Sequence, residues 1–274
     1  MQRFGQRQQQ NDGSELVYWI WLRKVNGIGC HTAHKLLEVF GEPKRIYEAD
    51  FGELCKVEGI GKEKAKQILE SRSLAEAERV LFECGRNGIG ILTMNDCRYP
   101  EAAKKIIDMP THLFYKGTLR SNSMGTAIVG ARRCSKEGKA QSVKYAMELA
   151  EQGIPVISGM AKGIDSYAHT ACLRAGGYTV AILGNGLDIC YPAEHKILMQ
   201  RIAEQGLLLS EYEPGIKPNA KHFPARNRII AAWSNRVIIV EAGKGSGALI
   251  TGDIARKYGR EVKIIIDFIK RSSD

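Results

Sequence analysis

The stretch TAIVGAR, residues 126–132, decides the fold, because an apolar run there ends at a glycine and passes into a helical pattern. The same transition recurs in VISGMAKGID (156–165), VAILGNG (180–186) and VIIVEAGKGSGALIT (237–251). In an open α/β sheet the carboxyl ends of parallel strands meet at one edge, where glycine turns and helix N-termini bind phosphates and nucleotides. The repeated pattern therefore predicts a site for an anionic ligand at that edge.

Strands and helices alternate regularly from residue 126 onward. The predicted strands are 126–130, 155–159, 179–183, 207–211, 237–241 and 261–266, and the predicted helices are 136–152, 164–175, 194–204, 226–232 and 248–258. Such alternation with Val- and Ile-rich strands indicates an α/β fold with a doubly wound, mostly parallel sheet. Two earlier strands, 88–94 and 111–117, are expected to extend this sheet, and 120–125 has the composition of a linker.

The first hundred residues have a mainly helical pattern, with helices predicted at 15–25, 32–40, 62–71 and 74–87. Within them VNGIG (25–29) and VEGIG (57–61) are near-copies, each a glycine turn that runs into a helix. This pattern is typical of a paired helix-hairpin-helix module, whose hairpins expose backbone N–H groups that suit a DNA phosphate. Alternatively, Ile28 and Ile60 only build a small helical core, and Glu58 is unfavourable beside phosphate.

Composition narrows the class of protein. The 274 residues are 44% hydrophobic and carry a formal net charge of +10, which fits a nucleic-acid partner. Seven cysteines form no CxxC pair, and we expect reduced, mostly buried thiols. No apolar run approaches the roughly 18–20 residues that span a bilayer, so we expect a cytoplasmic protein with no membrane partner.

We predict a disordered tail at 1–14, a helical domain at 15–87 and an α/β domain at 88–274.

The first two glycine turns combine positive charge with small residues. The first turn, GARRCS, is not the GxGxxG fingerprint, and no acidic residue ends the next strand, which argues against ordinary NAD binding. Arg132 and Arg133 instead follow the strand directly, where guanidinium groups clamp phosphate oxygens in a planar fork. In the second turn Lys162 lies between Gly159 and Gly163 at a helix start and supplies a point charge for another phosphate.

Asp165 and His169 follow the second turn. We expect Asp165 to cap the helix or to hold the turn. His169 has no cysteine or histidine partner at metal-binding spacing, so it is interpreted as a packed histidine. No metal site is predicted anywhere in the chain.

Two further segments supply polar residues. FPARNRIIA, residues 223–231, places basic residues in the first turn of the predicted helix, where they oppose the helix dipole unless an anion offsets them. The later stretch EAGKGSGALIT gives a polar, glycine-lined helix start without the GK[ST] ending of a triphosphate-binding P-loop. The sequence therefore does not predict ATP hydrolysis.

The sequence contains no pattern that identifies a catalytic nucleophile or an acid–base pair. Ser158, Ser210 and Ser246 have no GxSxG context, and no partner is identified for Asp188 or Glu211. Three aromatic residues fall near the glycine turns and either stack on exposed bases or pack in the core: Tyr167, Tyr191 and Phe223. We predict a binding protein with no cofactor and no enzymatic activity.

Six ordered motifs resemble those of the DNA-processing protein A family (DprA/Smf): AIVGARRCSKEG, SGMAKGIDSYAH, AILGNGLDICYPAEH, LLLSEYEPG, FPARNRIIA and VIIVEAGKGSGALIT. RYPEAAKKIIDMPTHLFYKG, before the sheet, matches as well. The resemblance covers nearly the whole chain, from the helix-hairpin-helix region to about residue 261.

This resemblance implies a Rossmann-like domain preceded by a SAM-like helix-hairpin-helix domain. It also implies sequence-independent binding of single-stranded DNA, homodimers, and help in loading RecA recombinase onto incoming DNA during competence and natural transformation. Carried over to this chain, the DNA site comprises Gly130, Arg132, Ser135, Lys162, Gly163, Arg226, Asn227, Arg228, Ser246, Gly247 and Thr251. The physical interpretation of the turns adds Arg133 and Gly159.

The chain departs from the family pattern near its end. After GREV the family has a Val-Phe-Ala-Val-Pro-Gly strand and turn, whereas this chain continues KIIIDFIKRSSD. The winged-helix domain of many members is also expected to be absent, and a strand at 262–266 is expected to complete the sheet.

Two alternatives remain open from sequence alone. Nucleotide-cleaving enzymes or sensors of the lysine-decarboxylase-like group use a comparable pocket with a PGGxGTxxE signature, and EAGKGSGALITGD lacks its catalytic glutamate in that context. In the other alternative the protein is an adaptor whose helix-hairpin-helix part makes every DNA contact, while the Rossmann-like domain serves dimerisation.

Overall fold

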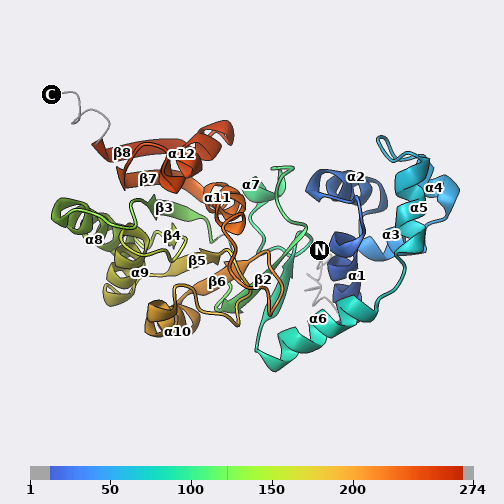
Figure 1. Cartoon of the computed structure of the whole chain (residues 1–274), viewed down its shortest axis with the longest axis horizontal. Helices are drawn as coiled ribbons and strands as arrows, with labels where there is room; N and C mark the ends of the chain where they lie inside the picture. Colours follow the sequence, from blue (N-terminus) through green and yellow to red (C-terminus); the bar gives the residue numbers. More distant parts are fainter. Residues whose placement is uncertain (1–12, 122, 268–274) are drawn as a thin grey trace, which may run out of the picture. The chain divides into compact units, whose positions relative to one another are not determined.

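The computed structural model describes residues 13–121 and 123–267 (Figure 1). Apart from its last two residues, which open the first helix, the predicted disordered tail lies outside the described residues. The chain divides into two compact units, with the boundary between Glu83 and Cys84. This boundary falls inside a helix, a few residues before the predicted division at 87/88.

The first unit is helical. Its elements are α1 (Gly13–Lys24), α2 (Cys30–Phe40), α3 (Pro43–Glu48), α4 (Phe51–Cys55), α5 (Lys62–Glu70) and α6 (Ala75–Arg86), which crosses the boundary. The sequence prediction missed α3 and α4. Asp50 and Glu53 form a reciprocal capping box at the start of α4, and a proline occupies the first turn of α3. Both are recognised helix-start signals.

The two glycine turns of the first unit have the same local structure. Gly27 and Gly59 have φ values of 76° and 82°, in the left-handed region that favours glycine. In each turn the amide of the isoleucine donates to the carbonyl of the valine three residues earlier, at 3.2 and 3.0 Å. Ile28 and Ile60 are both buried. The predicted paired helix-hairpin-helix arrangement is confirmed, and its two isoleucines lie in the core.

The second unit is built on a mixed sheet. Its strands are β1 (Gly90–Thr93), β2 (His112–Gly117), β3 (Gly125–Val129), β4 (Val156–Ser158), β5 (Thr179–Leu183), β6 (Leu207–Ser210), β7 (Ser234–Ala242) and β8 (Glu261–Asp267). Among the described residues the strand order is β1-β2-β6-β5-β4-β3-β7-β8. The six strands from β6 to β8 in this order pair in parallel, whereas β2 pairs antiparallel with β1 and β6. The prediction that β1 and β2 extend a mostly parallel sheet is confirmed.

The order of strands reverses beside β3. From β3 the chain builds outward through β4, β5 and β6, and then returns to place β7 on the other side of β3. In doubly wound sheets, ligands bind in the crevice outside the carboxyl ends of the strands at such a reversal. The strand order therefore predicts a ligand site at the segments that follow β3 and β7.

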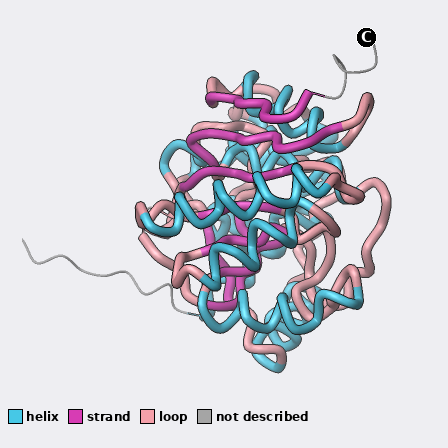
Figure 2. The backbone as a smooth tube through the Cα atoms, turned by 90° about the vertical axis from the view of Figure 1, so that its left-hand side faces the viewer, coloured by secondary structure: helices cyan, strands magenta, loops and turns pink. Residues whose placement is uncertain are grey.

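Helices cover both faces of this sheet (Figure 2). They are α7 (Glu101–Lys104), α8 (Lys136–Glu151), α9 (Ile164–Arg174), α10 (Lys196–Gln205), α11 (His222–Ala232) and α12 (Gly247–Lys257), with a 3-10 turn at Ala193–His195. Alternate residues of one strand enter opposite cores: Ala127 and Val129 pack with α11 and α12, and Ile128 packs with α8 and α9. Burial on both faces explains the nearly continuous apolar strands.

The cysteines depart from the prediction. Of the seven, all within the described residues, Cys84 and Cys172 are buried, Cys97 is exposed and the other four are half-buried. The expectation of mostly buried thiols is therefore wrong, because several of these residues lie at helix ends or in loops, which run over the surface. Among the described residues, no helix has the length and apolar character to cross a membrane.

Candidate nucleic-acid interface

A cavity of about 700 Å³ opens beside the carboxyl ends of β3 and β7. Seven of the thirteen predicted site residues line it: Gly130, Arg132, Arg226, Asn227, Ser246, Gly247 and Thr251. They come from the turn after β3, the first half of α11 and the start of α12. The structure thus brings together three segments that are far apart in the sequence, at the crevice that the strand order predicts.

One wall of the cavity combines a cation with aromatic rings. The guanidinium carbon of Arg132 lies 5.7 Å from the ring centroid of Phe223. The Phe223 ring stacks in turn on Tyr191, with centroids 5.5 Å apart and planes at 26°. Tyr167 does not line this cavity; its ring lies under the ammonium group of Lys139. A cation beside stacked rings suits a phosphate next to an exposed base.

Arg226 is buried rather than presented to solvent. Its Nη1 donates to the carbonyl oxygens of Gly159, at 2.7 Å, and Ile182. Helix α11 begins at His222, so Arg226 lies in the second helical turn and the predicted first-turn position is wrong. Burial lowers the pKa of Arg226 to about 10, against the opposing effect of Asp165, and the guanidinium remains charged at neutral pH.

Asp165 holds the second glycine turn. Its Oδ2 accepts hydrogen bonds from the amides of Gly159 at 3.1 Å and Ala161 at 3.3 Å, whereas the N-cap position of α9 is Gly163. The predicted turn-holding role is confirmed. Burial raises the pKa of Asp165, while the charge of Arg226 and these amide bonds lower it. Asp165 and Arg226 therefore form a compensating pair of buried charges behind the turn.

The three predicted glycines of these turns allow close packing. A Cβ atom at Gly159 would lie 2.5 Å from Arg226 Nη1, and one at Gly130 would lie 2.6 Å from Ile164 Cγ1. A Cβ atom at Gly163 would overlap the carbonyl oxygen of Ala131. Glycine is needed at these positions so that the turn after β3, the turn after β4 and α11 can approach one another.

Other predicted site residues make contacts within the protein. Ser135 caps α8 by accepting from Gly138 N at 2.9 Å, and its hydroxyl donates to Glu241 Oε2 at 2.9 Å. Lys162 Nζ lies 2.6 Å from Glu194 Oε1, and both side chains are 56% exposed. An exposed ion pair of this kind contributes little to stability, so it leaves Lys162 available to a competing phosphate. Arg133 is exposed and does not line the cavity.

The start of α12 forms the polar floor of the cavity. Asn227 Nδ2 donates to the carbonyl of Gly247 at 3.1 Å, and Thr251 Oγ1 donates to the same oxygen at 3.0 Å. Ser246 occupies the N-cap position without a side-chain cap, and its buried Oγ finds no hydrogen-bond partner among the described residues. A buried hydroxyl without a partner beside a helix N-terminus suits an anionic ligand.

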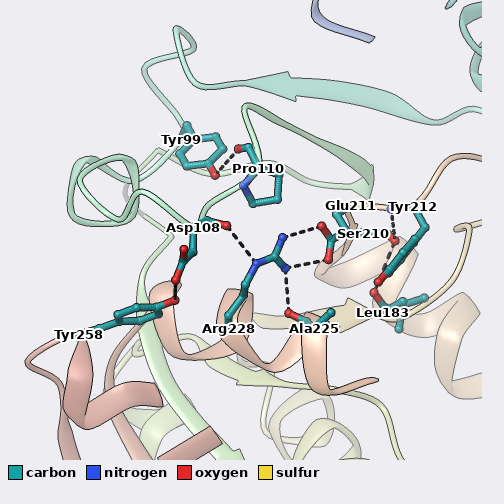
Figure 3. Close-up of polar contacts among 10 residues, drawn as sticks. All are labelled: Tyr99, Asp108, Pro110, Leu183, Ser210, Glu211, Tyr212, Ala225, Arg228 and Tyr258. Carbon is teal, nitrogen blue, oxygen red and sulfur yellow. Dashed lines mark hydrogen bonds and ion pairs between the residues drawn. The ribbon is translucent and has the colours of Figure 1, made fainter. Parts of the chain in front are cut away.

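Arg228 lies outside the cavity lining. Its guanidinium makes two bonds of 2.7 Å to Glu211, one to each carboxylate oxygen (Figure 3). The structure therefore corrects the statement that Glu211 lacks a partner. The same correction applies to Asp188, whose carboxylate accepts from the amide of Gly215 at 2.9–3.0 Å. Both carboxylates have structural partners that their sequence context did not reveal.

His169 is fully buried in α9, as the interpretation of a packed histidine requires. Its Nδ1 lies 2.7 Å from the hydroxyl of Thr179, which itself donates to Val156 O. The hydroxyl therefore accepts from Nδ1–H, and Nε2 is the unprotonated nitrogen, with no partner among the described residues. Burial, helped by His195 and Arg226, lowers the pKa of His169 to about 3.

This low pKa predicts acid sensitivity. The unfolded chain takes up a proton at His169 below about pH 6.5 while the folded chain does not, so stability is complete above that pH and falls as pH falls toward 3. We expect His169 alone to cost about 1.4 kcal/mol per pH unit in that window. Urea unfolding of wild type and His169→Gln between about pH 7.5 and about pH 5 measures this. Equal slopes for the two proteins would contradict the assignment.

Comparison with known sequences identifies the family. A sequence model described as DNA recombination-mediator protein A matches residues 90–273, and a SAM-like helix-hairpin-helix tandem matches residues 22–72. The chain belongs to the DNA recombination-mediator protein A family. Protein Smf of Synechocystis is 37% identical over 254 residues, which cover 91% of this chain and 64% of that protein. This family member thus spans somewhat less than two thirds of the length of that relative.

Two solved structures of the recombination-mediator family resemble the chain. DNA processing protein A from Streptococcus pneumoniae is 36% identical with a TM-score of 0.78, and the match covers 92% of this chain and 87% of the other. DNA processing protein A from Helicobacter pylori, which has a unique single-stranded DNA binding mode, is 32% identical with a TM-score of 0.59. That match covers 64% of this chain and 80% of the other. The Rossmann-like fold and the helix-hairpin-helix unit are those expected of the family.

In this family member, sequence reasoning missed one segment of the cavity. Pro218, Asn219 and Ala220 line it from the loop between β6 and α11. The segment has the composition of a loop and is flanked by Lys217 and Lys221, a signal that the sequence analysis did not use. Among the described residues, no group of three or more His, Cys, Asp and Glu side chains is arranged to hold a metal ion.

Proposed function

We propose that this chain binds single-stranded DNA without regard to sequence, protects incoming DNA and helps to load RecA onto it during natural transformation. In this proposal the protein is a cytoplasmic homodimer that performs no catalysis. The observation that carries the DNA-binding part is the Arg132–Phe223–Tyr191 wall at the mouth of the cavity beside β3 and β7. The parts concerning RecA and dimerisation are supported by membership of the family.

The chemistry of the cavity supports a ligand held mainly through phosphate. Arg132 offers a guanidinium fork, and the start of α12 offers the hydroxyl of Ser246 beside a helix N-terminus. Phe223 and Tyr191 offer flat faces on which any base can stack. Phosphate contacts and stacking carry little sequence information, so the proposed binding does not discriminate between bases.

Lys162 extends the proposed site along the strand. It lies in the turn beside Ala161, which lines the cavity, and its ion pair with Glu194 is exposed to solvent. A phosphate that approaches from solvent can replace the Glu194 carboxylate at small cost. Arg133, Ser135, Gly159, Gly163 and Arg228, which do not line the cavity, stay predictions of the sequence for direct DNA contact.

A salt series with labelled oligo-dT tests the proposal. If three to five phosphates are neutralised, log affinity falls with log salt with a slope of about −2 to −3.5. Arg132→Ala removes one contact and is expected to weaken binding and to make the slope shallower by about 0.7. Arg174→Ala, an exposed arginine at the end of α9 and outside the cavity lining, is the matched control and should change neither quantity. Fluorescence anisotropy measures both.

The outcomes separate the competing functions. A slope near zero would exclude the phosphate-clamp mechanism. A steep slope that Arg132→Ala leaves unchanged would place DNA in the helix-hairpin-helix unit, as the adaptor alternative requires. Release of free base from nucleoside monophosphates would instead support the nucleotide-cleaving alternative.

A further inference from the structure

Helix α11 presents different residues to the cavity and to the rest of the unit. Phe223, Pro224, Arg226, Asn227 and Ile230 line the cavity, and Arg228 does not. Residues three and four apart share one face of a helix, so all of these lining residues except Pro224 form one face, and Arg228 lies off that face. Arg228 therefore contacts neighbouring segments of the second unit and does not enter the cavity.

The contacts of Arg228 join three parts of the second unit (Figure 3). Its two amino groups bind the two oxygens of Glu211, which directly follows β6, at 2.7 Å each. Its Nε donates to the carbonyl of Asp108, in the segment between α7 and β2, at 3.0 Å. Nη1 also donates to the carbonyl of Ala225 within α11, at 2.8 Å. One side chain thus connects α11 to a strand end and to a loop.

The ion pair is well shielded from solvent. The side chains of Arg228 and Glu211 are 19% and 5% exposed. A two-point guanidinium–carboxylate contact fixes orientation as well as distance, and its attraction is screened little when it is buried. Removing either partner takes this two-point contact away from the other side chain.

A second contact ties the same loop to α12. The hydroxyl of Tyr258, which caps the end of α12, donates to Asp108 Oδ2 at 3.3 Å. Burial and the nearby Asp108 carboxylate raise the pKa of Tyr258 to about 12, so this hydroxyl keeps its proton at neutral pH. Asp108 is therefore contacted from α11 through its carbonyl and from α12 through its carboxylate. Two of the helices that line the cavity, α11 and α12, are therefore anchored to one loop.

We propose that Arg228 and Glu211 are a positioning pair that holds α11, and with it Phe223 and Asn227, in the geometry that receives the ligand. Arg228 then touches no phosphate. This inference rests on the proposed function, because it concerns affinity at the same cavity. It assigns Arg228 a different role from direct DNA contact, and it gives Glu211 a role in binding a polyanion although Glu211 is itself negative.

Glu211→Gln separates this proposal from simple electrostatics. Removing a negative charge near a polyanion site strengthens binding if only the overall field matters. If Glu211 positions α11, the same substitution weakens oligo-dT binding, by about tenfold, and leaves the salt slope unchanged. Glu148→Gln removes a half-exposed carboxylate that pairs with Lys144 on α8 and is the matched control. The control should leave affinity the same or slightly higher.

Arg228 variants test the other partner. Arg228→Ala is expected to weaken binding about tenfold with an unchanged salt slope, whereas loss of a phosphate contact would make the slope shallower by about 0.7. Arg228→Ala/Glu211→Gln should bind no more weakly than Arg228→Ala, because the two residues act as one unit. Arg228→Lys keeps the charge without the fork, and it replaces the alanine variant if the latter does not fold.

Hydrogen exchange gives a readout that needs no DNA. We expect Glu211→Gln to speed amide exchange in α11, residues 222–232, relative to wild type and Glu148→Gln. Tighter DNA binding by Glu211→Gln, a shallower slope for Arg228→Ala, or unchanged exchange in α11 would each overturn the proposal. If wild type does not bind oligo-dT at all, the proposed function fails, and the exchange data still decide whether the pair holds α11.

Discussion

Arg226→Met is expected to lower the free energy of unfolding by about 3–5 kcal/mol, measured by urea titration at neutral pH. Arg226 is 5% exposed and compensates the buried carboxylate of Asp165. Its guanidinium also satisfies the carbonyl oxygens of Gly159 and Ile182. Methionine fills a similar space, so the expected loss comes from the uncompensated charge and the unsatisfied carbonyls rather than from a cavity.

Two controls separate charge from shape. Arg226→Lys keeps the positive charge but cannot reproduce the planar fork, and it should lose less stability than Arg226→Met. Adding Asp165→Asn to Arg226→Met removes the uncompensated carboxylate and should recover part of the loss. If Arg226→Met alone costs less than about 1 kcal/mol, the buried pair is not what holds the turn.

The sign of the pH effect gives an independent check on this pair. Burial raises the pKa of Asp165 above its usual value, and removing Arg226 is expected to raise it further. Above about pH 4 the unfolded chain releases the Asp165 proton, whereas the folded variant still holds it. The free energy of unfolding therefore falls as pH rises from the pKa of Asp165 in the unfolded chain to its higher pKa in the folded variant. Arg226→Met should therefore be closest to wild type in stability at the acid end of that interval.

The sheet could be predicted from sequence because its signal is local. Strand β5 was expected at residues 179–183, and the structure has Thr179–Leu183. The strands are buried on both faces, so each is a short apolar run with a glycine or polar turn at its end. The short helices α3, α4 and α7 were missed because helices of four to six residues show too little periodicity, although the Asp50–Glu53 capping box marks α4.

The site was predictable to the extent that strand order alone creates it. The segments after β3 and β7 meet because these two parallel strands are neighbours at the point where the strand order changes direction. This places Arg132 and Ser246 in the lining of one cavity. What the sequence did not reveal are the long-range pairings of polar and charged side chains. Glu211 pairs with Arg228 across 17 positions, and Ser135 with Glu241 across 106. Periodicity carries no information about such long-range partners.

The buried pairings also change what the motif residues do. The family resemblance places Arg226 and Arg228 of FPARNR in the DNA site. The structure buries the guanidinium of Arg226 under the second turn and directs that of Arg228 to Glu211. Phe223, from the same stretch, lines the cavity with its aromatic ring stacked on Tyr191. A basic motif at the edge of a sheet can thus have side chains that hold the edge together, while a separate exposed residue, here Arg132, lines the cavity.

Gly163→Ala is expected to cost about 3 kcal/mol or more and to weaken oligo-dT binding together with stability. The residue has φ 77° and ψ −127°, a combination open to glycine and strained for any L side chain. An added Cβ would also overlap the carbonyl oxygens of Ala131 and Arg132. Backbone atoms cannot swing aside as a side chain does, so the turn itself must move, and Arg132 must move with it.

Gly176→Ala is the matched control for this substitution. Gly176 also has a positive φ, 72°, but nothing lies within 4 Å of its Cβ position. It should therefore cost only the intrinsic strain of a left-handed alanine, about 1 kcal/mol, and leave DNA affinity unchanged. Urea unfolding and anisotropy on both variants measure the difference. Equal losses of stability would mean that the contact between the two turns contributes nothing, and unchanged DNA affinity in Gly163→Ala would mean that this contact does not position Arg132.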